Sequence, residues 1–307
     1  MSRPAVDVVV PFVGSDRELS ELIERLHTLH RIPGDTLTVV DNRPGPRSGP
    51  SSPEVLHAPE RQSSYYARNR GAARGRASWI VFLDDDVEVS RGLLDGFFAP
   101  PPGDDVAVLR GAIRTTPGGE GPVARYGLIS GHMGNEHVSD DGLQFAQTAN
   151  AAVRRAAFAA VGGFAQDIRS GGDADLCFRL RDAGLRLEDR PAARAGHPPR
   201  STLRTMLRQY LRYGASAHWL GQRYAPFSPP IRFATIGRWL AGAAVKAPWL
   251  ALRGRRDDAL RRALNPVIVL AHEVGRFVPP RWPGASRWRS SRCPCRPASA
   301  RRGRPTS

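Results

Sequence analysis

The chain of 307 residues carries 45 basic and 29 acidic side chains, which gives a formal net charge of +16. A hydrophobic content of 41% is enough for one large core or two smaller ones, which excludes a chain that is disordered throughout. Lys246 is the single lysine, so a lysine-bearing phosphate loop and a Schiff base are both excluded from residues 1–230. Three cysteines are too few for a disulfide framework or a four-cysteine zinc site. Because the N-terminal segment also lacks a long apolar stretch, we expect a cytoplasmic protein.

The first 110 residues alternate between buried-strand and helix patterns. Short apolar runs rich in Val, Ile and Phe predict strands over residues 6–12, 36–41, 79–83 and 106–109. Helical spacing of apolar residues follows the N-cap candidate Ser15, and a second, Arg-rich helix is predicted over residues 65–76. This order predicts an α/β fold with an open, mostly parallel sheet and helices on both faces. Ligands of such sheets bind beyond the carboxyl ends of the strands.

The middle of the chain is less regular. Residues 111–147 are Gly-rich, with His132, His137 and a candidate strand near Phe145. Beyond them we predict helices over 152–160 and 174–183, the second ended by Gly184, and a last strand over 185–189. Residues 201–224 show an amphipathic helical pattern, and the apolar runs 233–252 and 263–278 are interrupted by charge and Pro. The predicted units are 1–200, a helical extension over 201–278 and a disordered basic tail over 279–307.

Three consecutive acids, Asp84, Asp85 and Asp86, follow the strand at 79–83. Adjacent carboxylates repel one another, and a divalent cation such as Mg²⁺ or Mn²⁺ is the usual compensation. The alternative interpretation of these three acids is a solvated turn that binds no metal. An ATPase is disfavoured because the matching Gly-x4-Gly-Lys-Ser/Thr loop is missing, and a dinucleotide oxidoreductase because Gly-x-Gly-x-x-Gly does not follow the first strand. The residues favour a nucleotide site built from acids at strand ends and a metal.

The motifs DVVVPF, VVDN, ARNRGAARGRASWIVFLDDDV, TANAAVRRAAFAAVGGF and GGDADLCFRLRDAG occur in this order. Together they resemble the landmarks of family 2 glycosyltransferases of the GT-A fold, over about residues 5–200. The resemblance implies that Asp41 lies beside the nucleotide base, that Asp84 and Asp86 span ribose and metal, and that Asp173 is the catalytic base. The family usually has an acidic pair where this chain has Gly172-Asp173, so the base assignment depends on Asp173, with Asp175 two residues further on.

Other polar residues are assigned from the same comparison. Arg68 and Asn69, with Arg70, could reach the diphosphate, or they could be solvated helix residues. Asp85 is placed with the nucleotide-sugar ligands, Asn150 matches a family position near the donor or acceptor sugar, and Asp175 would contact the acceptor or the helix dipole. His197 could be a third metal ligand, although a structural histidine is the alternative. By its spacing, Cys177 should be a core residue.

The chemistry can be stated from the residues. A metal held by Asp86 would neutralise the leaving diphosphate, and a base would take the proton of the attacking acceptor hydroxyl. Asp173 is the candidate base. Because Asp is a favourable N-cap residue, its alternative role is to cap the helix that follows.

The C-terminal part is strongly basic. Residues 231–307 hold 17 basic and 3 acidic side chains, a net charge of +14, whereas residues 1–230 hold 28 and 26. Apolar runs with Trp239, Trp249 and Phe277 among many Arg residues favour helices that lie on an anionic membrane surface over nucleic-acid binding. We expect a peripheral protein at the inner face of the cytoplasmic membrane, with no nucleic-acid partner. The stretch RQYLRYGASAHWLGQRY also resembles glycosyltransferases of the mycofactocin-associated type.

These patterns predict a metal-dependent, inverting glycosyltransferase that uses a nucleoside-diphosphate sugar, with UDP favoured, and a hydroxyl acceptor. A catalytically silent, basic adaptor of the same fold that binds membrane or nucleic acid is the alternative. A sugar-1-phosphate nucleotidyltransferase is disfavoured because it needs a Gly-rich, Lys-bearing loop near the N-terminus.

Overall fold

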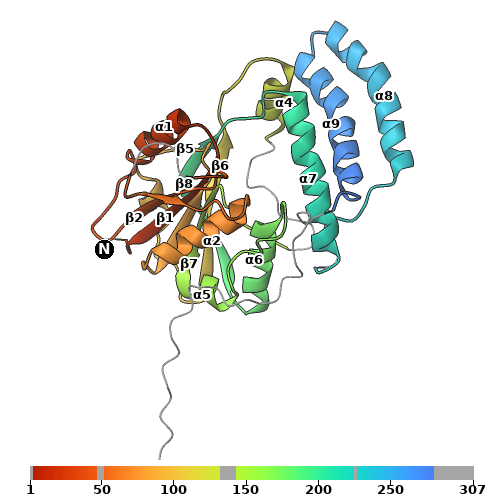
Figure 1. Cartoon of the computed structure of the whole chain (residues 1–307). Helices are drawn as coiled ribbons and strands as arrows, with labels where there is room; N and C mark the ends of the chain where they lie inside the picture. The colour runs from red at the N-terminus through yellow and green to blue at the C-terminus, as the bar shows by residue number, and fades with distance from the viewer. Residues whose placement is uncertain (1–2, 47–51, 132–142, 225–226, 280–307) are drawn as a thin grey trace, which may run out of the picture.

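The computed structural model describes residues 3–46, 52–131, 143–224 and 227–279, and its strands form one mixed sheet (Figure 1). The order across the sheet is β3-β2-β1-β4-β7-β6-β8-β5. Parallel pairing joins the first four positions, β3 (Val55–His57), β2 (Thr36–Asp41), β1 (Val6–Phe12) and β4 (Trp79–Leu83). The α/β class and the strands predicted over residues 6–12, 36–41 and 79–83 are therefore confirmed, whereas β3 was not predicted.

The antiparallel strand β7 determines the strand directions in the second half of the sheet. β7 (Asn150–Arg154) runs antiparallel to both β4 and β6 (Val106–Thr115), and β8 (Arg186–His197) is parallel to β6. The short β5 (Glu88–Val89) runs antiparallel to β8. Because two antiparallel pairings separate β4 from β6, the strands β4, β6 and β8 end at the same edge of the sheet.

The predicted helix over 152–160 is wrong in its first part. Residues up to Arg154 belong to β7, and α5 (Arg155–Ala160) begins only there. Alanine-rich sequence favours a helix, but this segment fills the gap between two strands, and pairing on both sides decides its state. β6 and β8 also extend beyond their predicted ends at 109 and 189. Phe145 lies outside any strand, and His132 and His137 lie outside the described residues.

Helices cover both faces of the sheet, as predicted. α1 (Asp16–Leu26) and α3 (Leu93–Gly96) pack on the face that receives Val8 and Val10, whereas α2 (Ser64–Arg74), α5 and α6 (Gly172–Asp182) pack on the face that receives Val9. Ser15 caps α1 in a reciprocal pair with Glu18. The alternation of side chains along one strand thus builds two separate cores.

Four helices form a layer beside the sheet: α4 (Pro122–Ser130), α7 (Leu203–Gly221), α8 (Phe233–Leu252) and α9 (Arg256–Gly275). α9 lies between α7 and α8, and α8 is outermost (Figure 1). α7 and α9 approach so closely at Gly214 that a Cβ there would come within 1.8 Å of the carbonyl oxygen of His272. None of the described helices combines the length and the apolar character needed to cross a membrane. The predicted unit boundaries stay predictions, and 280–307 of the predicted tail lie outside the described residues.

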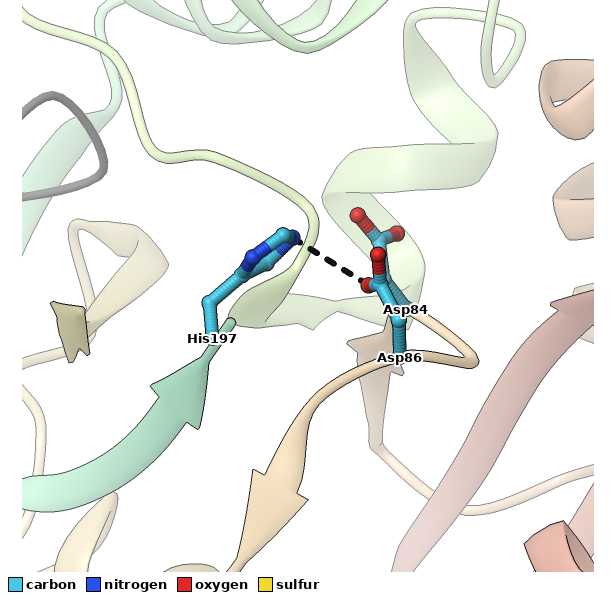
Figure 2. A group of neighbouring side chains, drawn as sticks. All are labelled: Asp84, Asp86 and His197. Carbon is cyan, nitrogen blue, oxygen red and sulfur yellow. Dashed lines mark ion pairs between the residues drawn. The ribbon is translucent and has the colours of Figure 1, made fainter. Parts of the chain in front are cut away.

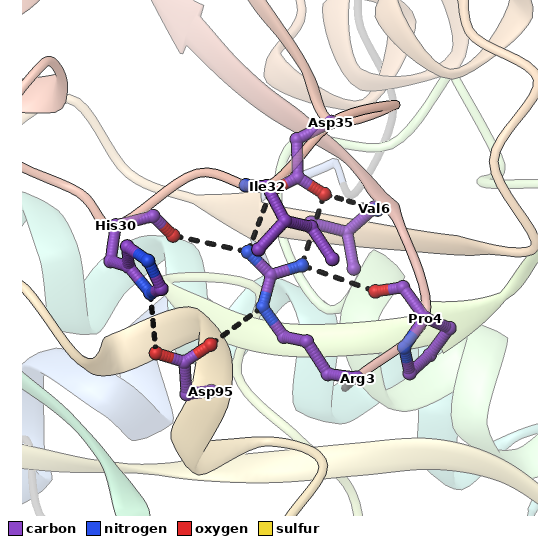
Figure 3. Close-up of polar contacts among 7 residues, drawn as sticks. All are labelled: Arg3, Pro4, Val6, His30, Ile32, Asp35 and Asp95. Atoms are coloured by element: carbon purple, nitrogen blue, oxygen red, sulfur yellow. Dashed lines mark hydrogen bonds and ion pairs between the residues drawn. The ribbon is translucent and has the colours of Figure 1, made fainter. Parts of the chain in front are cut away.

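Arg3 ties the start of β1 to the loop before β2 and to α3 (Figure 3). Its guanidinium forms ion pairs with Asp35 at 2.6 Å and with Asp95 at 2.8 Å, and it donates to the carbonyl oxygens of Pro4 and His30. The side chains of Arg3 and Asp35 are both buried. This group of contacts closes the amino end of the sheet.

Asp35 is held as a carboxylate in this position. Burial acts to raise its pKa, but the hydrogen bonds from Arg3 and from the backbone amides of Ile32 and Val6 bring the pKa below the usual value. A carboxyl group with a lowered pKa stabilises the fold above its unfolded pKa, and this stabilisation is lost as the pH falls through the folded pKa.

Replacement of Arg3 by alanine should lower the free energy of unfolding by about 2 kcal/mol at neutral pH, because it leaves the buried Asp35 carboxylate without its cation. The difference from the wild type should shrink below about pH 4, where Asp35 in the variant becomes protonated. Urea denaturation at pH 7 and at pH 3 measures both effects. Arg17→Ala is the control: its ion pair with Glu21 is exposed, and no measurable change is expected. An equal effect of the two substitutions would contradict the assignment.

Candidate functional site

Asp84 and Asp86, which follow β4, meet His197 at the end of β8 (Figure 2). One possible ligand atom from each residue lies within 4.8 Å of the others. The imidazole Nε2 of His197 is 3.1 Å from Oδ1 of Asp86, and its Nδ1 lies 2.8 Å from the carbonyl oxygen of Pro198. The contact with Pro198 orients the ring so that Nε2 faces the two acids.

The donor set fits a divalent cation. Two carboxylates suit Mg²⁺ and Mn²⁺, and an imidazole nitrogen favours the transition metal of the two. Three protein ligands would leave coordination positions for oxygens of a bound molecule. The metal ligands predicted from the sequence are therefore brought together by the fold, because β4 and β8 end at the same edge.

The acids repel one another as the sequence suggests. Burial and the charge of Asp86 raise the pKa of Asp84, against the effect of Arg68. Burial and its two acidic neighbours raise the pKa of Asp85 to about 6. For Asp86, burial is outweighed by the hydrogen bond and charge of His197 and by Arg200, so its pKa is lowered.

Two arginines supply positive charge at this site. Arg68 of α2 is buried and pairs with Asp84, and its Nε has no hydrogen-bond partner within the described part of the chain. Arg200 lies 3.4 Å from Asp86 and donates through Nε to Gln209 of α7. Arg68 is one of the candidate site residues named from the sequence, whereas Arg200 is not. The signal for Arg200 was its place in the motif GHPPR, three residues after His197.

Asp173 lies in the first turn of α6, after Gly171 with φ +82°. Its carboxylate accepts a hydrogen bond from the hydroxyl of Tyr65 at 2.9 Å and is 3.3 Å from the backbone nitrogen of Thr148. A Cβ at Gly172 would come within 2.6 Å of the Tyr65 ring, so a small residue is needed there. The alternative that Asp173 caps α6 is wrong, because Gly171 is the N-cap residue and the carboxylate bonds to other elements.

Asp41 ends β2 at the same edge of the sheet but outside the group formed by Asp84, Asp86 and His197. Its buried carboxylate forms an ion pair with Arg43 at 2.8 Å, and Arg43 also binds Asp16 at 2.6 Å. Burial acts to raise the pKa of Asp41, but the hydrogen bonds from Arg43 lower it overall. The guanidinium of Arg43 therefore lies between the predicted base-binding acid and α1.

The two asparagines occupy different environments. Asn69 makes reciprocal hydrogen bonds to the backbone amide and carbonyl of Phe164, and so ties α2 to the loop after α5. Asn150 begins β7 opposite Leu83, the residue before Asp84. Its Nδ2 donates to two backbone carbonyls, and its buried Oδ1 has no hydrogen-bond partner among the described residues. A buried acceptor to which no described residue donates favours a ligand contact at Asn150.

Asp175 is a buried residue whose carboxylate is bound by other side chains. Its two oxygens bind Arg179 at 2.8 Å and the hydroxyl of Tyr224 at 3.1 Å, and the residue is buried.

Cys177 is buried on the same helix, as predicted, and burial raises the pKa of its thiol to about 12. Arg70, by contrast, is exposed.

The structure predicts different effects for the two acids in the first turn of α6, Asp173 and Asp175. Asp175→Ala should lower the free energy of unfolding by about 2 kcal/mol, since Arg179 and Tyr224 lose a buried partner. Asp173→Asn should leave stability nearly unchanged, because the amide oxygen still accepts from Tyr65. Thermal and urea denaturation measure both. Severe destabilisation by Asp173→Asn would show that Asp173 is chiefly a structural residue.

Named proteins match parts of the chain. A stretch of 186 residues is 35% identical to "Pre-mycofactocin glycosyltransferase" of Mycobacterium tuberculosis, covering 58% of this chain and 39% of that protein. "Glycosyltransferase AglE" of Haloferax volcanii is 30% identical over 148 residues, 48% of each chain. The chain therefore spans less than half the length of these relatives.

The solved structure of "Mannosyltransferase PcManGT from Pyrobaculum calidifontis in complex with GDP-Man and Mn2+" superposes with a TM-score of 0.62 over 90% of this chain and 88% of that one. The sequence identity is 16%, so this likeness concerns the fold, which is that of the GT-A glycosyltransferases. The sequence model of glycosyl transferase family 2 matches residues 7–162, which is more than half of the chain. The chain belongs to glycosyl transferase family 2.

Proposed function

We propose that the protein transfers a sugar from a nucleoside-diphosphate sugar to a hydroxyl acceptor, with inversion at the anomeric carbon and with a divalent cation at Asp84, Asp86 and His197. The observation that carries this proposal is the convergence of these three ligands near Asp173, whose charge is close enough to raise the pKa of Asp84. Membership of family 2 and the GT-A fold support the reaction class.

The donor diphosphate would lie against the acidic edge of the sheet. A bound Mn²⁺ or Mg²⁺ would neutralise its negative charge as the bond to the sugar breaks. Arg68 and Arg200 already pair with Asp84 and Asp86, and they would add positive charge around the phosphates. The unpartnered Nε of Arg68 is a donor that a phosphate oxygen could satisfy.

Asp173 would act as the general base. The oxygen of the acceptor hydroxyl forms the bond to the anomeric carbon, the bond from that carbon to the diphosphate breaks, and the hydroxyl proton passes to the carboxylate of Asp173. Tyr65 and Thr148 fix the orientation of this carboxylate. A single displacement from the face opposite the diphosphate inverts the configuration.

We infer a role for each of the remaining predicted residues. Asp41 would contact the nucleotide base after a rearrangement of Arg43. Asp85 would be one of the residues that bind the nucleotide sugar. Asn150 would bind a sugar hydroxyl through Oδ1. Asn69 and Asp175 would support the site through their bonds to Phe164 and Arg179. UDP stays our prediction for the nucleotide, and GDP is the comparison because PcManGT holds GDP-Man.

We also propose that the protein works peripherally at the cytoplasmic face of a membrane. The +14 charge of residues 231–307 supports this location.

Mn²⁺ should raise the affinity for UDP or GDP by at least about tenfold, and Asp86→Ala should abolish the increase because it removes a ligand. Titration calorimetry with MnCl2 or with EDTA measures the effect. Asp182→Ala, at the exposed end of α6, is the matched control and should behave as the wild type. Nucleotide binding that is equally tight in EDTA would contradict metal dependence.

Asp173→Asn should retain metal-dependent donor binding and lose transfer by roughly 10²- to 10⁴-fold, because it removes the proton acceptor and keeps the shape. The assay is the release of nucleoside diphosphate from a panel of nucleotide sugars in the presence of a cell extract that supplies acceptors. Asp182→Asn serves as the control. Full activity of Asp173→Asn would rule out Asp173 as the base, and donor binding without turnover in the wild type would favour the silent adaptor.

A further inference from the structure

α8 packs against the rest of the protein through one stripe of side chains. Ile236 and Ala243 are buried against α9, and Leu240, Ala247 and Leu250, which lie within about 40° of them on the helical wheel, are half-buried. Because α8 is the outermost helix, its opposite side has no neighbour among the described elements (Figure 1).

The opposite side of α8, which we name the outward face, consists of Ala234, Arg238, Ala241, Val245, Trp249 and Leu252. The exposed fractions of Val245, Trp249 and Leu252 are 73%, 48% and 88%. The outer side of a surface helix in a water-soluble protein is normally polar. Five of the six residues on this one are apolar, so water is an unfavourable neighbour for the outward face.

The charges on and beside this helix have one sign. Arg238 and Lys246 are the charged residues within α8, and both are exposed. Arg232 precedes the helix and Arg253 follows it. The nearby acids of α9 are already paired, Asp257 with Arg125 and Asp258 with Arg255. An apolar face with a cationic border is complementary to a surface that is apolar inside and anionic outside.

Two tryptophans strengthen this match. Trp249 lies on the outward face, with the guanidinium of Arg253 4.1 Å from its ring centre, and Trp239 lies on the side of α8 nearer α9 with 42% of its surface exposed. Indole rings are enriched at the boundary between water and lipid. Trp239 also lines a cavity of about 400 Å³ between α4, α8 and α9, whose walls include Tyr126, Pro266 and Ile268.

We propose that the outward face of α8 docks on an anionic lipid bilayer, with the helix lying along the surface and not crossing it. A second copy of the chain would fit less well, because a symmetric contact would place Arg238 and Lys246 of each copy beside the same cations of the other. A nucleic acid would leave Val245, Trp249 and Leu252 without apolar partners. The proposal specifies the surface and the lipid chemistry of the peripheral location proposed above, and it does not require sugar transfer.

Flotation of the full chain with vesicles of phosphatidylcholine, alone or with phosphatidylglycerol, tests the proposal. The wild type should float with vesicles that contain phosphatidylglycerol and should be released at high salt. Val245→Glu combined with Trp249→Glu should reduce binding at least about tenfold, because it places charge in the apolar centre of the face. Arg238→Gln and Lys246→Gln should each weaken binding to the anionic vesicles by about fivefold.

Controls separate this result from other causes. Leu203→Glu, at an exposed apolar position of α7, should leave vesicle binding unchanged. Circular dichroism and metal-stimulated nucleotide binding should be unchanged in the double variant, so a failure of docking is distinguishable from a failure of the proposed function. Undiminished vesicle binding by the double variant, or no binding by the wild type, would overturn the proposal. So would a wild-type dimer that the double variant converts to a monomer while vesicle binding stays the same.

Discussion

The repulsion among three consecutive carboxylates at the end of β4 is the constraint around which this structure is arranged. Two like charges about 4 Å apart repel by roughly 4 kcal/mol at the effective dielectric of a protein surface, a large share of the stability of a domain. The cations that offset it come from far apart in the sequence, Arg68 from α2 and His197 and Arg200 from the end of β8 and just beyond. The acids therefore tie together the two halves of the sheet.

The antiparallel strand β7 makes this convergence possible. Because β7 is antiparallel to both β4 and β6, the strands β4 and β6 run in the same direction. β8 is parallel to β6, so its last residue, His197, lies at the edge of the sheet where the acids follow β4. The same arrangement puts Asn150, the first residue of β7, opposite the last residue of β4. β7 thus lets β8 bring His197 to the acids, and it places Asn150 beside the end of β4.

The sequence predicted three of the four strands in the parallel half of the sheet, because residues 6–12, 36–41 and 79–83 are apolar runs typical of buried strands, but it did not predict the short β3. It failed at residues 150–154, where alanine-rich sequence fits a helix as well as a central strand and the neighbouring strands decide. The candidate metal ligands could be proposed from their positions after strands and from the family resemblance. The partners that orient the site could not, because Tyr65 and Arg200 contact Asp173 and Asp86 only after folding.

The central claim is that Asp84, Asp86 and His197 hold a divalent cation that binds the phosphates of a nucleotide. Anomalous diffraction at the manganese edge, from crystals grown with Mn²⁺ and a nucleoside diphosphate, tests it most directly. The account predicts one strong anomalous peak within coordination distance of Asp86 and of Nε2 of His197, bridged to phosphate oxygens. Ordered nucleotide with no peak at these residues, or with the peak elsewhere, would contradict it.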